Sequence, residues 1–221
     1  PALSTDQVEL VRRWIDQGAR LDAETATDTP LFRLAPRLPH PPAPDIYPAV
    51  LPVTAMAIST GNDLVATSGY HEVLLWSLPE GQLVRRIGNV AQRVHSVAFH
   101  PDGRRLAVAS GTPGRLGELK LFDVNSGELL EDLWVSHDSV LSLAFSPDGK
   151  YVACGDTTGS IVAFSIDGAA TQIWLAQDHS DWVNSVAWSS DGARLVSASR
   201  DRTCKLLDGR TGALSLTFNG H

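Results

Sequence analysis

One phrase, Val140-Leu-Ser-Leu-Ala-Phe-Ser-Pro-Asp-Gly149, recurs along the chain and decides how the chain folds. The other copies are Val53-Thr-Ala-Met-Ala-Ile-Ser59, Val94-His-Ser-Val-Ala-Phe-His-Pro-Asp-Gly103 and Val183-Asn-Ser-Val-Ala-Trp-Ser-Ser-Asp-Gly192. Their leading valines are 41, 46 and 43 residues apart. A period of this size indicates a repeat architecture in which each repeat is one supersecondary unit.

Each repeat is expected to contribute four antiparallel strands. In the second repeat, residues 94–99 alternate without charge, as a strand covered on both faces requires. Pro101-Asp102-Gly103 predicts a tight turn, because proline sets the first central residue and glycine accepts a positive φ. Strands are predicted over residues 106–110, 118–124 and 129–133. This pattern predicts an all-β fold made of four four-stranded β-propeller blades.

The ends of the third strands resemble the WD-repeat β-propeller family. Asp123 and Asp208 occupy the aspartate of the family's Trp-Asp pair, with Phe122 and Leu207 in place of tryptophan. Trp76 keeps the tryptophan but is followed by serine. The Ser-Pro-Asp-Gly phrase is also typical of that family, and the resemblance covers most of the chain from the first copy of the phrase onward.

Composition narrows the classes of partner. The 221 residues carry a formal net charge of −7 and a pI of about 5.4, which argues against a nucleic-acid footprint. No apolar run approaches the length of a membrane span. Cys154 and Cys204 both lie in predicted strands, which favours buried free thiols over a bridge.

Three segments are expected along the chain. Residues 1–20 are predicted to hold a short helix from a preceding domain, with Ser4 and Gln7 as a capping box, Leu3 in a hydrophobic staple and Gly18 at the end. Residues 21–48 form a proline-rich linker. The propeller follows over 49–221, with blades at about 49–90, 91–135, 136–177 and 178–221.

The first stretch carries a second resemblance. Ala2-Leu-Ser-Thr-Asp-Gln-Val-Glu-Leu-Val-Arg-Arg-Trp-Ile-Asp-Gln-Gly-Ala19 resembles the last helix of a planctomycete-type cytochrome c domain. This would imply a bacterial, exported or periplasmic parent with haem upstream of Pro1; without it, a cytoplasmic location is expected. The haem motif Cys-x-x-Cys-His is absent from these residues, so no cofactor is expected here.

His179, Ser197 and Asp201 are the residue types of a hydrolase triad. They also match the WD-repeat pattern, in which a histidine, a hydroxyl and a turn aspartate form a hydrogen-bonded structural network. Leu207 replaces the tryptophan that would complete it, and no Gly-x-Ser-x-Gly elbow is present. We interpret the three as structural rather than catalytic, and the seven histidines show no metal-ligand spacing.

The candidate binding residues lie where loops would form one rim. The segment Gly111-Thr-Pro-Gly-Arg-Leu-Gly117 replaces two residues of the first repeat and is either a plain surface loop or a contact loop. The rim candidates are Tyr70, His71, Arg115, Asp181, Trp182, Arg200 and Arg202. Tyr70 and Trp182 are the aromatic anchors, and either could equally pack against a neighbouring blade.

Four blades alone would leave two apolar faces bare. The chain would continue in a longer parent, close as a ring of four, or pair with a second copy into a ring of eight, and we favour the pairing. The function expected is a non-catalytic scaffold that presents rim loops to a protein partner, without metal. The alternative is an accessory propeller of an exported c-type cytochrome.

Overall fold

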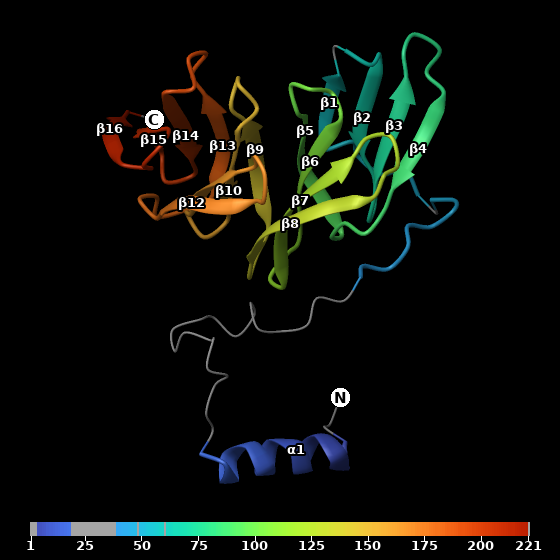
Figure 1. Ribbon diagram of the computed structural model, residues 1–221, viewed down its shortest axis with the longest axis vertical. Helices are drawn as coiled ribbons and strands as arrows, with labels where there is room; N and C mark the ends of the chain where they lie inside the picture. The colour runs from blue at the N-terminus through green and yellow to red at the C-terminus, as the bar shows by residue number, and fades with distance from the viewer. Residues whose placement is uncertain (1–3, 19–38, 48, 60, 221) are drawn as a thin grey trace. The chain divides into compact units, whose positions relative to one another are not determined.

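The computed structural model describes residues 4–18, 39–47, 49–59 and 61–220 (Figure 1). The chain divides into two units, residues 1–37 and 38–221. In the first unit, helix α1 spans Thr5–Asp16 and begins with the predicted capping box. The Ser4 N–H donates to Gln7 Oε1 (2.9 Å), the Gln7 N–H donates to Ser4 Oγ (3.3 Å), and Gly18 follows at φ +88°.

The predicted staple at Leu3 lies outside the described residues, as do residues 21–38 and 48 of the predicted linker over 21–48. No described helix is long and apolar enough to cross a membrane.

The second unit contains four antiparallel sheets, each built from four consecutive strands. The first sheet holds β1 (Met56–Ser59), β2 (Leu64–Ser68), β3 (Val73–Ser77) and β4 (Leu83–Ile87). The second holds β5 (Arg93–Phe99), β6 (Arg105–Thr112), β7 (Leu116–Asp123) and β8 (Leu129–Ser136). The third holds β9 (Val140–Phe145), β10 (Tyr151–Asp156), β11 (Ile161–Ser165) and β12 (Thr171–Ala176). The fourth holds β13 (Val183–Trp188), β14 (Arg194–Ser199), β15 (Thr203–Asp208) and β16 (Leu214–Asn219).

The hydrophobic core lies between successive sheets. The first strand of each later sheet packs on the inner strands of the sheet before it, as β5 does on β1 and β2. Leu75 of the first sheet and Phe122 of the second belong to one apolar cluster, and Leu121 of the second sheet and Val152 of the third belong to another. This face-to-face stacking of sheets confirms the predicted propeller blades, and it explains why the inner strands lack charge on both faces.

The second, third and fourth copies of the repeated phrase form the same turn, closed by the N–H groups of Gly103, Gly149 and Gly192. Ser146 Oγ donates to Asp148 Oδ1 (2.6 Å) and accepts from the Tyr151 N–H (3.0 Å), while Gly149 takes φ +72°. An L side chain is strained at such a φ, so glycine is required there. The turn prediction is therefore confirmed with its mechanism.

Two cysteines are free, and only Cys154 is buried. Burial in the core raises the pKa of the Cys154 thiol. The prediction of buried free thiols is thus correct for Cys154 but wrong for the burial of Cys204, which is partly exposed in the last sheet.

The first and fourth sheets end the row of blades (Figure 1), and closure of the sheets into a ring is not found among the described residues. On the outer face of the first sheet, Met56 and Ile58 are 66% and 57% exposed. On the outer face of the fourth, Leu216 and Phe218 are 49% and 48% exposed. Both end faces therefore present apolar side chains.

Candidate interaction surface

We define the rim as the turns between the second and third strands, together with the segments that lead into the next sheet. These parts touch one another at every junction between sheets. Tyr70 bridges to Arg93, and the Gly114 N–H donates to Asp138 Oδ1 (3.1 Å). Gly159 lies so close to the His179 carbonyl that a Cβ would be 2.4 Å from its oxygen. The rim is therefore an ordered surface rather than a set of separate loops.

The predicted candidates Tyr70 and His71 lie in the turn of the first sheet. Their rings meet edge to face, with centroids 4.7 Å apart. His71 Nδ1 lies 3.0 Å from the Val90 carbonyl, and Gln92 Nε2 donates to the Tyr70 hydroxyl (3.3 Å). Both residues thus make packing contacts with the segment that leads into the second sheet.

A segment upstream of the sheets crosses this part of the rim. Residues 39–47, called the strap below, form the blue trace beside the first sheet in Figure 1. The Tyr47 hydroxyl donates to Glu72 and accepts from the Tyr70 N–H (3.2 Å). Burial and the neighbouring Glu72 raise the pKa of Tyr47. Arg86 donates hydrogen bonds to both carboxylate oxygens of Glu72 (2.7 and 2.9 Å) and to the Pro44 carbonyl (2.6 Å).

The strap makes a second attachment at the second sheet. His40 Nε2 lies 2.8 Å from Glu118 Oε2, and the His40 N–H donates to Asn89 Oδ1 (3.1 Å). Glu118 is 3% exposed and also pairs with Lys120 at 2.9 Å. Burial opposes ionisation of Glu118, but the hydrogen bond from His40 and the charge of Lys120 hold its pKa below the usual range.

The segment 111–117 is a strand extension and not an irregular loop. Thr112 pairs with Leu116 and Gly111 with Gly117, so the second and third strands run farther than predicted. A Cβ on Gly117 would lie 1.8 Å from the Asp138 carbonyl oxygen, so only glycine allows this close approach. The candidate Arg115 is exposed at the tip of this hairpin.

Three candidates gather on the fourth sheet. The Arg200 guanidinium stacks over the Trp182 ring, 4.9 Å from its centroid, and its Nε lies 3.7 Å from Asp181 Oδ2. Trp182 is 42% exposed, so the contact fixes the ring while one part of it faces solvent. Arg202 is exposed in the same turn, at φ +69°.

The predicted network of the fourth sheet is present in the geometry. His179 Nδ1 lies 2.8 Å from Asp201 Oδ2, and its Nε2 lies 2.8 Å from Ser197 Oγ. Burial opposes ionisation of Asp201, yet hydrogen bonds from Thr203 and His179 hold its pKa well below the usual value. Ser197 is 1% exposed, so its hydroxyl is buried against His179 and closed to solvent.

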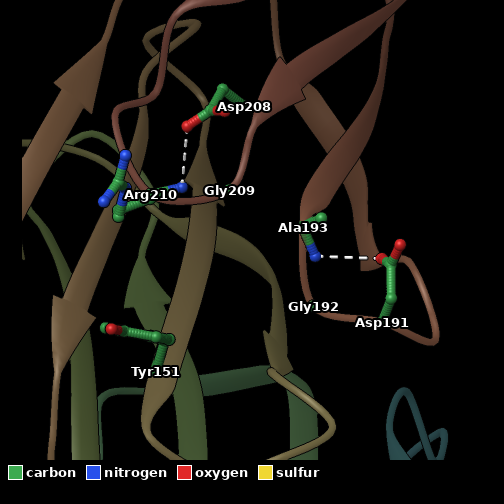
Figure 2. Close-up of a pocket in the computed structure, with 7 residues that line it drawn as sticks. All are labelled: Tyr151, Asp191, Gly192, Ala193, Asp208, Gly209 and Arg210. Atoms are coloured by element: carbon green, nitrogen blue, oxygen red, sulfur yellow. Dashed lines mark hydrogen bonds between the residues drawn. The ribbon is translucent and has the colours of Figure 1, made fainter.

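The far end of the third and fourth sheets holds a pocket of about 310 Å³. Figure 2 shows Asp191 and Asp208 beside it, accepting hydrogen bonds from the N–H groups of Ala193 and Arg210 (both 3.0 Å). Each carboxylate thus accepts hydrogen bonds from backbone N–H groups of its own turn. Among the described residues, no group of three or more side chains is placed to hold a metal ion.

Sequence reasoning missed the strap contacts of His40 and Tyr47 and their acceptors Glu118 and Glu72. One signal was available. When the repeats are superimposed, Glu72 and Glu118 fall where the later repeats have a hydroxyl side chain. That position lies five residues before the end of the third strand in each sheet. A long carboxylate there indicates a hydrogen-bond partner that the later repeats do not have.

Comparison with known proteins agrees with this fold. The model of the WD domain, G-beta repeat, matches residues 129–165 and 171–208, and the model of the anaphase-promoting complex subunit 4 WD40 domain matches residues 56–146. The chain belongs to the WD-repeat β-propeller family. Each WD match begins in the outer strand of one sheet and ends in the third strand of the next, so one repeat links two blades.

Three relatives illustrate the family. WD repeat-containing protein SL1-17 of Schistosoma mansoni is 30% identical over 71% of this chain and 50% of its own length. Eukaryotic translation initiation factor 3 subunit I of Aspergillus fumigatus is 28% identical over 73% of this chain and 52% of its own. Periodic tryptophan protein 2 of Saccharomyces cerevisiae is 32% identical over 57% of this chain and 13% of its own.

The chain spans about half the length of the first two relatives. One of these relatives is a WD-repeat protein by name, and another is a translation-factor subunit. They come from eukaryotes and lend no support to the expected bacterial origin.

Proposed function

We propose that this protein is a non-catalytic scaffold whose rim binds a protein partner. The observation that carries the proposal is Trp182, which is 42% exposed and held in place by Arg200 and Asp181. An ordered, half-exposed tryptophan beside an arginine has the composition of a binding hot spot, because it buries a large apolar area with little loss of side-chain freedom.

A comparison of rim and far-end variants tests this proposal. The chain would be immobilised as wild type, Trp182→Ala and Arg210→Ala, and proteins captured from an extract of the source organism would be quantified by mass spectrometry. Loss of a hot-spot side chain costs about 2 kcal/mol or more, so at least one captured protein should fall about tenfold or more with Trp182→Ala. Arg210→Ala, at the opposite end, should retain that protein. Equal capture by both variants would count against a rim site.

An enzymatic role has little structural support. The buried position of Ser197 favours a structural role for the network of His179, Ser197 and Asp201. Support for an accessory role beside a cytochrome is confined to the resemblance of the N-terminal stretch.

A further inference from the structure

One position of the repeat separates the first two sheets from the last two. The residue five positions before the end of the third strand is Glu72, Glu118, Ser160 or Thr203 in the four sheets. Thr203 Oγ1 donates to Asp201 Oδ1 (2.7 Å). The Ser160 N–H donates to Asp156 Oδ1 (3.0 Å), and the Ser160 hydroxyl lies 2.8 Å from Thr158 Oγ1 in the same turn. The last two sheets therefore satisfy this position internally.

In the first two sheets the longer carboxylates reach the strap instead. Glu72 accepts from Tyr47, and Glu118 lies 2.8 Å from His40 Nε2. Both carboxylates are almost fully buried, with 1% and 3% exposure. His40 therefore occupies, relative to Glu118, a role like that of His179 beside Asp201, but it comes from a separate segment.

The strap has the chemistry of an extended peptide ligand. Prolines at three of its interior positions limit the backbone to extended conformations, which reduces the entropy lost on binding. Its attachments are two side chains seven residues apart and a carbonyl held by Arg86 (2.6 Å). Ile46 remains 85% exposed, so the strap lies on the surface rather than in the core.

The carboxylates of Glu72 and Glu118 keep hydrogen-bond partners even without the strap. Glu72 retains both bonds from Arg86. Glu118 retains Lys120 (2.9 Å), the Ala91 N–H (2.6 Å) and the Ser110 hydroxyl (3.0 Å). Departure of the strap therefore leaves no buried charge alone, and it breaks only a few hydrogen bonds of about 1 kcal/mol each.

We propose that the rim of the first two sheets is a groove for an extended proline-rich segment that carries a histidine and a tyrosine seven residues apart. The strap is its built-in occupant, and a partner protein with such a segment binds by displacing the strap. This inference goes beyond the scaffold role proposed above, because it places a second binding site on the first two sheets, away from Trp182.

A labelled peptide provides the test. A fluorescent peptide of residues 38–48 would be titrated by anisotropy against the wild-type chain and against the full-length double variant His40→Ala/Tyr47→Ala. A tethered strap has an effective concentration of about 1 mM, so the double variant should bind the peptide about tenfold or more tightly than the wild type. A peptide with alanine at both anchors should not bind.

Two further variants in the released background locate the groove. Adding Glu118→Gln should weaken peptide binding, because it removes the negative charge facing the peptide's histidine. Adding Trp182→Ala should leave peptide binding unchanged, which separates this result from the test of the fourth-sheet surface. Equal binding by the released variant and the wild type, or equal binding of a scrambled peptide, would overturn the proposal. A released variant that loses its circular dichroism spectrum would also overturn it, because the strap would then be an essential part of the fold.

Discussion

His179 and His40 each place an imidazole beside a carboxylate at the rim, but they come from different parts of the chain. Each imidazole lies 2.8 Å from a carboxylate at the rim, Asp201 for the first and Glu118 for the second. His179 belongs to the segment that leads into the fourth sheet, whereas His40 reaches its carboxylate from 78 positions upstream. A buried carboxylate needs hydrogen-bond donors, and these can come from a segment close in the sequence or from a distant one.

Substitution of Ser197 by alanine tests whether the fourth-sheet network is structural. The change leaves the buried His179 Nε2 without its 2.8 Å partner. We expect the free energy of unfolding, measured by urea denaturation, to fall by about 1–3 kcal/mol. The exposed Arg202→Ala should change it by less than about 0.5 kcal/mol. A Ser197→Ala variant as stable as the wild type would show that the hydroxyl does not support the sheet.

The hairpin of β6 and β7 shows how one strand pair is adapted to its neighbour. Its strands continue to Thr112 and from Leu116, past the point where the other sheets turn. Glycines at 111 and 117 bring this extension against Ser139 and the Asp138 carbonyl. The hairpin therefore ties the second sheet to the third at the rim.

Gly117→Ala should weaken the contact between the β6–β7 hairpin and the segment that leads into the third sheet. Its Cβ would meet the Asp138 carbonyl oxygen at 1.8 Å, and backbone cannot yield as a side chain can. We expect a loss of about 3 kcal/mol in the free energy of unfolding, as in overpacked cores. Gly88→Ala is the matched control, because Gly88, like Gly117, has no positive φ but has open space around it, and the change should cost less than about 0.5 kcal/mol. Equal losses would mean that the contact with the Asp138 carbonyl does not set the cost.

At the scale of the whole molecule, the four sheets are stabilised by packing face to face on one another. Each interior sheet buries both faces, whereas the outer faces of the first and fourth sheets expose Ile58 and Phe218. An exposed apolar sheet face of this kind favours contact with another sheet. We propose that two copies of this chain cover these faces for one another.

Light scattering over a dilution series measures this directly. We expect a mass near twice 23.7 kDa for the wild type. Ile58→Glu places a charge on the outer face of the first sheet and should shift the mass toward that of the monomer. Trp182→Ala, on the rim, should not. A monomeric mass for the wild type at every concentration would contradict the pairing.

The repeat, the four-stranded units and the turn at Gly149 could be read from the residues in order. They depend on local requirements: strand alternation, a proline or a hydroxyl at a turn, and glycine at a positive φ. The network of His179, Ser197 and Asp201 was also predictable, because the three match the pattern of the WD-repeat family. By contrast, the apolar Ile46 and Tyr47 indicated only that part of the proline-rich stretch lies along the sheets, and no residue pattern paired Glu118 with a partner. Tertiary structure decided that His40 meets Glu118 and that Tyr47 meets Glu72, since these pairs form only after two sheets have stacked and brought distant segments together.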